Sequence, residues 1–313
     1  MTAEVWGMVG AGVAALVAGL VFVRTRMAAA TGAGQILLLG PVCEAAALAV
    51  FAAEHFFAAR DLASIVPHWL PAPLFWAYFV GAALLAASIS FIAWRQVRWS
   101  AALLSLLFLI IVATIDVPNL PMHLHERLFW TLTVREMALA SGAMVLAGSV
   151  WPRGAASIVL VRLGRGFVTL VMIFYAIEHF LFPRNVPGVP LEKLTPAWMP
   201  APVLISYVVG IALLLGGIGL FFRPATRIAA AGAGSVLLLL TVFFYVPIFV
   251  TEMHGTLAVE GMNYVGDTLL WAATVLLAGF GADRSAESSV QSVHEGVPSE
   301  SVSLPEDGPV QSV

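Results

Sequence analysis

Apolar residues form long blocks along this chain, and short polar segments separate one block from the next. The blocks are about 20 residues long, which is the length that an α-helix needs to cross a bilayer. The pattern predicts an all-α polytopic membrane protein with about nine transmembrane helices. The expected spans are 5–23, 35–57, 73–94, 101–117, 131–150, 160–182, 202–222, 228–250 and 264–281.

Composition supports the membrane prediction. Of the 313 residues, 60% are hydrophobic and only 11% are charged, whereas roughly a quarter of the residues in a soluble domain are charged. Too few polar residues are available to cover a globule in water, so the lipid bilayer is the expected partner and no nucleic acid is expected. The single cysteine, Cys43, excludes an intramolecular disulfide and a dithiol redox centre within the chain, and we interpret it as a small apolar side chain.

A polar motif at the end of one span occurs a second time in the chain. Each copy is a Glu-His-Phe triplet, followed by a loop with the sequence Pro-x-Trp-x-Pro and then by the next span. The first copy contains Glu54, His55, Phe56, Pro67, Trp69 and Pro71, and the second contains Glu178, His179, Phe180, Pro196, Trp198 and Pro200. The loop is longer in the second copy. A common apolar composition does not account for shared Trp, Pro, Glu and His residues, so the motif predicts an internal duplication.

The duplication divides the chain into four parts. We predict an extra N-terminal transmembrane helix in residues 1–32, a first four-helix unit in 33–152 and a second four-helix unit in 153–281. Residues 282–313 are rich in Ser, Glu and Val and show no apolar face at helical spacing, which predicts a disordered cytoplasmic tail. No Lys or Arg precedes the first span, so this helix is expected to be retained rather than cleaved as a signal peptide.

The basic residues lie mostly on one side of the predicted membrane. Ten of the 15 Lys and Arg residues fall on one set of loops and span ends. The opposite side has only Arg60, Arg127, Arg135, Arg184 and Lys193. Because cytoplasmic loops carry an excess of Lys and Arg, this distribution predicts a cell-membrane protein with its N-terminus outside and its C-terminus in the cytoplasm. Both Glu-His-Phe triplets are then near the outer face.

Ionisable residues within the spans are the candidate functional residues, because they are costly to bury in a bilayer. Glu54, His55, Glu178 and His179 lie in the last turns of their spans. Two interpretations are open. These residues form a site near the outer surface, or they hold the following Trp-Pro loop in place through hydrogen bonds, and duplication suits both.

The first half contains features that the second half lacks, namely Glu44, Asp116 and the pair Arg135-Glu136. The counterpart of Asp116 is Tyr245, and the counterparts of Arg135 and Glu136 are Gly266 and Asp267. Glu44 is aligned with Val168 and follows Pro41, which is expected to weaken the helix beside it. An ion pair between Asp116 and Arg135 would neutralise both charges, and we expect it as one contact that joins their two spans. If one half has kept a chemical role, the first half is the better candidate.

A metal site is not predicted. Four His and four Glu residues would lie on the outer side, namely His55, His125, His179, His254, Glu54, Glu126, Glu178 and Glu252. Although imidazole and carboxylate suit Zn, Cu, Mn or non-haem Fe, no span carries a His pair two turns apart or a Glu-x-x-His sequence. The sequence leaves two cofactors open: a quinone, and a haem held between spans by His55 and His179.

The Glu-His-Phe triplet, the Pro-x-Trp-x-Pro loop and the Gly-containing span that follows them resemble the DoxX-like membrane proteins. The resemblance covers residues 33–150 and again 157–281. It implies four-helix units in which a polar motif ends the first helix, and a link to a quinol oxidase or another membrane redox system. Relatives that support disulfide formation are a poor guide, because this chain has only Cys43. Tandem duplication also departs from the usual single unit of the family.

Two functional hypotheses follow. The first is an accessory or binding protein, rather than a stand-alone enzyme, whose outer polar motif serves a quinol-linked membrane redox complex. The alternative is a small-solute or proton-coupled carrier, which Glu44 beside Pro41 at membrane depth and the parallel repeats support. A scaffold without a ligand is a third interpretation. The sequence does not indicate an oligomeric state.

Overall fold

The computed structural model describes residues 2–189 and 191–280, and the regular elements in these ranges are helices. The long helices are α1 (Ala3–Ala29), α3 (Leu39–Phe57), α5 (Pro73–Ala93), α6 (Val97–Ile111), α8 (Arg127–Val150), α9 (Ala155–Leu181), α10 (Pro202–Phe221), α11 (Thr226–Leu240) and α13 (Ala258–Ala278). The short elements are α2 (Ala33–Leu37), α4 (Ala59–Leu62), α7 (Val117–Asn119), α12 (Val246–Glu252), the 3-10 turn η2 (Leu120–Met122) and two π-helical segments, η1 (Val112–Asp116) and η3 (Thr241–Tyr245). The predicted all-α fold is confirmed for this part of the chain, and the predicted tail lies outside it.

Seven helical segments in the described ranges are long and apolar enough to cross a membrane. They are α1, the α2–α3 pair, α5, the run from α6 to η2, α9, α10 and the run from α11 to α12. The helices α8 and α13, which the sequence also predicts as spans, have a similar length but are not among these seven, and both carry charged and polar side chains within the helix. Other helices pack around both of them, so they do not need an apolar surface toward lipid.

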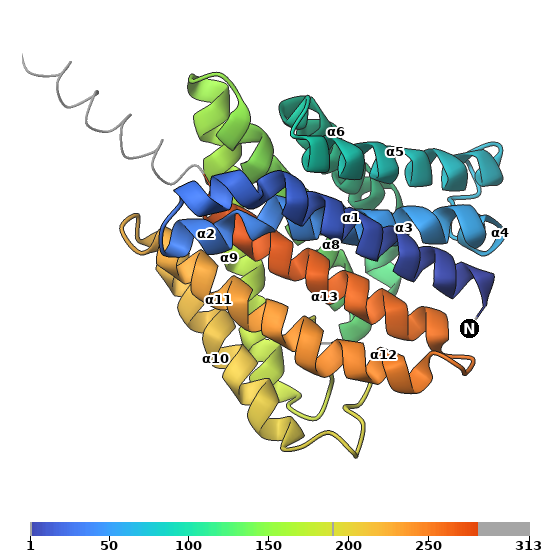
Figure 1. Cartoon of the computed structure of the whole chain (residues 1–313). Coiled ribbons are helices and arrows are strands. Elements are labelled where there is room, and N and C mark those ends of the chain that lie inside the picture. The colour runs from blue at the N-terminus through green and yellow to red at the C-terminus, as the bar shows by residue number, and fades with distance from the viewer. Residues whose placement is uncertain (1, 190, 281–313) are drawn as a thin grey trace, which may run out of the picture.

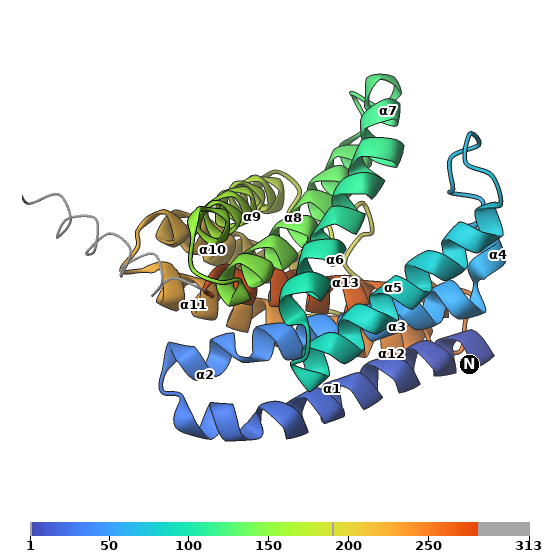
Figure 2. The same ribbon diagram turned by 90° about the horizontal axis from the view of Figure 1, so that it is seen from above.

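Helices from the two halves of the chain pack against each other. Helix α3 lies between α1 and α5, and α8 lies between α6 and α9. In the second half, α10 packs against α9 and α11, and α11 packs against α13. Helix α13 also packs against α3 and α8, so a helix of the second half closes the core of the first. The N-terminus and α4 lie at one end of the molecule and α2 lies at the other (Figures 1 and 2).

Helix α1 covers α3 with one narrow face. Its buried residues recur every three or four positions and are Val5, Met8, Gly12, Ala15, Gly19 and Val23. Gly12 and Gly19 lie against valines of α3, where a Cβ on either glycine would approach a valine carbon to 2.6 or 2.8 Å. The helices therefore come close together along this stripe, and the other faces of α1 are left for lipid.

Pro41 explains the break between α2 and α3. A proline ring clashes with the carbonyl group four residues before it, which here belongs to Leu37, and α2 ends at that residue. Leu38 separates the two helices, but the predicted span 35–57 still lies within a single membrane-spanning segment, Ala33–Phe57. The sequence places the weakened segment next to Glu44, and this is wrong in position. Glu44 lies within α3, after the break.

The two π-helical segments stand at matching distances before a proline. Segment η1 ends two residues before Pro118, and η3 ends two residues before Pro247. The carbonyl group that each proline ring would meet belongs to a residue within the π-helical segment. The wider π-helical turn accommodates this local disruption and keeps each span continuous.

The first and second helices of each half cross in the same way. A glycine of the second helix, Gly81 in α5 or Gly210 in α10, lies directly against the histidine of the Glu-His-Phe triplet. A Cβ on Gly81 would stand 2.7 Å from the histidine Cβ, and one on Gly210 would stand 3.0 Å away. The residues before the two helices, Ala72 and Ala201, also share a left-handed backbone, with φ of 55° and 46°.

Candidate functional site

A cavity of about 280 Å³ lies between α3, α5, α6, α8 and α13, and it is the candidate functional site. Its polar lining consists of Glu54, His55, Arg135, Glu136, Asn263 and Asp267. Its apolar lining consists of Leu48, Phe51, Leu62, Val80, Leu84, Leu107, Phe108, Ile111, Leu139 and Leu270. Four of the residues predicted from sequence are therefore brought together, and α13 adds two polar residues from the second half.

Arg135 is the centre of the polar lining. Its Nη1 donates to Asp267 Oδ2 at 2.6 Å, and its Nη2 donates to Glu136 Oε1 at 2.7 Å. The predicted ion pair with Asp116 is wrong, because Asp267 of α13 supplies the carboxylate instead. Asp116 Oδ2 and Arg135 Nε are buried, and neither has a hydrogen-bond partner among the described residues.

Glu54 is tied to α13 by a hydrogen bond. Asn263 Nδ2 donates to Glu54 Oε1 at 2.7 Å. The other amide atom, Asn263 Oδ1, is buried without a partner in the described part of the chain. Asn263 and Asp267 are one helical turn apart on α13, so they face α3 and α8 together. Sequence reasoning noted Asp267 only as the counterpart of Glu136 and missed Asn263, although both are polar residues in or beside a predicted span.

His55 presents an open hydrogen-bond acceptor. Its Nδ1 lies 2.8 Å from Phe51 O, which is a carbonyl oxygen and can only accept, so Nδ1 carries the hydrogen. In the neutral ring Nε2 is then an acceptor. His55 is one of the residues that line the cavity, so a ligand there can approach its ring.

The second Glu-His-Phe triplet has a different environment. Glu178 Oε2 accepts from Arg127 Nη1 at 2.7 Å. His179 Nδ1 donates to Tyr175 O, and His179 Nε2 accepts from the backbone N–H of Gly188 at 2.8 Å. In this half the triplet holds the following loop in place, which is the structural interpretation of the motif.

This arrangement does not fit a haem between His55 and His179. Axial ligation needs a free nitrogen lone pair on each ring. Both nitrogens of His179 are engaged with backbone groups. His179 therefore cannot serve as an axial haem ligand in this arrangement. Among the described residues, no group of three or more His, Cys, Asp or Glu side chains is placed to hold a metal ion.

Glu44 lies apart from the cavity. It is fully buried in α3, and neither carboxylate oxygen has a hydrogen-bond partner within the described ranges. It does not line the cavity that His55 lines, although the two residues belong to one helix. Burying a carboxylate without a hydrogen-bond partner costs free energy of folding. Packing alone therefore does not explain Glu44, which is a second candidate functional residue.

The Pro-x-Trp-x-Pro loops are surface features. Pro67 O accepts from Leu70 N at 2.9 Å, and Pro196 O accepts from Met199 N at 3.0 Å, so each sequence forms a tight turn. Trp69 is 67% exposed, and none of Pro67, Trp69 and Pro71 lines the cavity. Trp198 is also exposed, as is Pro200. Exposed tryptophans at span ends are typical membrane-interface anchors.

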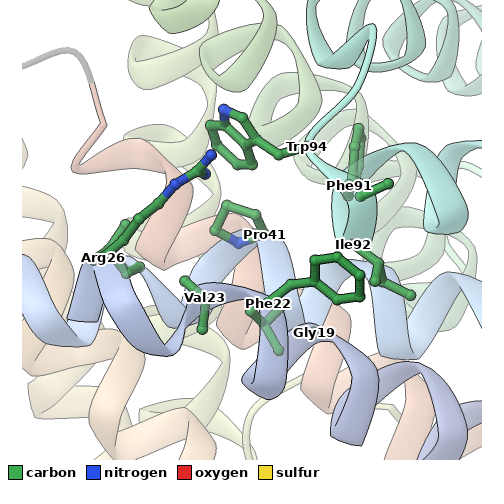
Figure 3. A pocket seen from close by; sticks show the side chains of 11 residues that line it. Gly19, Phe22, Val23, Arg26, Pro41, Phe91, Ile92 and Trp94 are labelled. Carbon is green, nitrogen blue, oxygen red and sulfur yellow. The ribbon is translucent and has the colours of Figure 1, made fainter. Parts of the chain in front are cut away.

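A second, smaller cavity of about 80 Å³ lies between α1, α3 and α5. The Arg26 guanidinium stacks on the Trp94 ring, with 4.5 Å between the guanidinium carbon and the ring centroid. Figure 3 shows these two side chains above Pro41, with Phe22 and Ile92 on the opposite side. This volume holds only a few water molecules, and no carboxylate lines it, so it is a weaker candidate site.

No protein-family model, curated protein or solved structure matches the chain. The DoxX-like resemblance therefore stays a prediction from the motif residues, and the functional argument rests on the cavity.

Proposed function

We propose that the protein is an integral membrane binding component of a quinol-linked redox system, and that a quinone or quinol head group occupies the cavity. The main support for this proposal is that the cavity has an apolar wall beside polar atoms that have no hydrogen-bond partner in the described chain. Arg135 Nε and Asn263 Oδ1 are buried beside the cavity, and neither is satisfied within the described chain. A small shift of these two side chains would let a ligand with a polar ring in the adjoining cavity satisfy such atoms, since buried polar groups normally have partners.

The size of the cavity supports a small ring. Drug-sized ligands occupy roughly 300–1,000 Å³, and this cavity of about 280 Å³ is just below that range. Its walls from α5 and α6 consist of Val80, Leu84, Leu107, Phe108 and Ile111, which suit an apolar substituent. The lining contains three carboxylates and one guanidinium, so an anionic ligand is disfavoured.

We further propose nine membrane spans, arranged as one leading helix and two DoxX-like units. The paired π-helical segments, the paired glycine–histidine contacts and the paired left-handed alanines support the two units. The distribution of Lys and Arg supports a cell-membrane location with the N-terminus outside.

The proposal is tested by binding. Decylubiquinone and its reduced form are titrated into the detergent-purified protein, and bound ligand is counted by native mass spectrometry. One molecule per chain is expected. Val80→Phe places a ring in the cavity and is expected to abolish binding, whereas Leu85→Phe on the exposed side of α5 is the matched control. Binding that survives Val80→Phe, or no binding by the unmodified protein, contradicts the proposal.

A proton-coupled carrier is the second candidate, and Glu44 is the observation that favours it. A fully buried carboxylate without a partner is a common feature of proton pathways in membranes. The test is substrate-driven proton uptake in proteoliposomes made with the unmodified protein and with Glu44→Gln. Uptake that persists in the variant removes Glu44 from the mechanism.

A further inference from the structure

We infer that the ligand of the cavity is a hydrogen-bond donor, bound at His55 Nε2 and extending toward Asp116 just beyond the cavity lining, so that a hydroxyl-bearing ring is preferred over its carbonyl-bearing oxidised form. This inference rests on the proposed function. It comes from the second half of the chain, where the protein's own backbone stands at the equivalent place.

Residues 186–189, which we call the plug, stand beside His179 in the second half. The Val186 and Val189 side chains are buried in the hydrophobic core of this half. The backbone N–H of Gly188 donates to His179 Nε2 at 2.8 Å, and the Tyr245 hydroxyl donates to Pro187 O. The peptide unit between Pro187 and Gly188 therefore bridges a histidine and a tyrosine.

The plug corresponds in position to the cavity of the first half. A Cβ on Gly188 would lie 2.9 Å from Leu240 and 3.9 Å from Leu237. These leucines align with Ile111 and Phe108, which line the cavity. The histidine on one side of the plug aligns with His55, and the tyrosine on the other aligns with Asp116.

The longer loop of the second half accounts for the plug. His55 and Pro67 are 12 positions apart, whereas His179 and Pro196 are 17 positions apart. The extra residues are held by a bridge between Asn185 and Leu194 and by Lys193, whose Nζ contacts Glu252 at 2.9 Å and Glu260 at 3.1 Å. The first half has the same histidine without the insertion, and there the cavity is open.

The two residues proposed to contact the ligand, His55 and Asp116, indicate whether the ligand donates or accepts hydrogen bonds. At one end, the histidine Nε2 accepts a hydrogen bond in the second half, and His55 Nε2 is an acceptor too. At the other end, the donor Tyr245 is replaced by Asp116, whose Oδ2 is buried without a partner in the described chain. Asp116 does not line the cavity; it ends η1, which begins directly after the lining residue Ile111. Both ends therefore call for a donor on the ligand.

Decylubiquinol and decylubiquinone form a suitable probe pair, because they share one ring and differ in having hydroxyl or carbonyl oxygens. We expect the quinol to bind about tenfold more tightly under anaerobic conditions, which is the effect of about one hydrogen bond. Equal binding, or tighter binding of the quinone, overturns the inference while leaving the proposed function standing. Absence of binding by both forms overturns the proposed function itself.

The variants Asp116→Tyr and Asp116→Phe test whether Asp116 accepts a hydrogen bond from the ligand. They differ only in the hydroxyl group, and the first restores the donor found in the second half. The ratio of the quinol and quinone dissociation constants is measured in each variant, so that a difference in folded fraction cancels. The tyrosine variant is expected to shift the preference about tenfold toward the quinone relative to the phenylalanine variant. Identical ratios in the two variants overturn the role of Asp116.

Discussion

At the residue scale, two buried glutamates of α3 differ in the partners that they have. Glu54 accepts a hydrogen bond from Asn263 of α13, whereas both oxygens of Glu44 are without a partner among the described residues. The first contact joins the two halves of the chain. The second residue carries only the cost of burying a polar group. Local sequence shows two glutamates in one apolar span and does not separate these roles.

The two glutamates should respond oppositely to replacement by leucine. Glu44→Leu removes an unsatisfied polar group and is expected to raise the midpoint of thermal unfolding. Glu54→Leu leaves Asn263 Nδ2 without its acceptor and is expected to destabilise the fold by about 1–3 kcal/mol. The midpoints are compared in one detergent by differential scanning fluorimetry. A lower midpoint for Glu44→Leu would show that Glu44 has a structural partner.

At the element scale, the crossing of α3 with α5 depends on the absence of a side chain at Gly81. Gly81→Ala would bring its Cβ within 2.7 Å of the His55 Cβ, so the helices must separate. We expect a loss of about 1–3 kcal/mol, as for other overpacked positions, together with weaker ligand binding. Gly232→Ala in α11 is the matched control, because nothing lies within 4 Å of the added methyl group. A neutral Gly81→Ala would contradict the packing described for the two helices.

The plug is an element that can be exchanged between the halves. Replacing residues 180–195 with residues 56–66 removes the insertion and is expected to open a second cavity beside His179. Ligand binding, counted by native mass spectrometry, should rise from one to two molecules per chain. Adding His179→Ala to this variant should return the count to one. A count that stays at one in a folded graft would show that the plug does not block a binding site.

At the scale of the whole molecule, the antiparallel helices place the loop after α3 and the loop after α8 at opposite ends. The proposed topology puts the first of these loops outside the cell. In a Cys43→Ala background, an impermeant maleimide should label Ser64→Cys in intact cells. It should label Gly154→Cys only after permeabilisation, and both positions are exposed in the structure. The reverse pattern would place the N-terminus in the cytoplasm.

Much of the architecture was predictable from sequence, because the bilayer imposes a helical length and a run of apolar residues that are local properties. The blocks from Pro73 and from Pro202 begin where the structure begins α5 and α10. The repeated Glu-His-Phe triplet also identified His55 as a candidate residue, and the charged residues peculiar to the first half identified Arg135 and Glu136. All three line the cavity.

Only the tertiary structure decided which charges meet. Arg135 binds Asp267, which is 132 residues away, rather than Asp116, because α13 of the second half packs into the core of the first. Hydrophobic periodicity predicts where a helix lies but does not predict its neighbours, since lipid and protein present similar apolar surroundings. The sequence by itself therefore determined a membrane protein of long helices with a repeated motif. The fold determined that one copy of that motif faces an open cavity and the other faces a loop of the same chain.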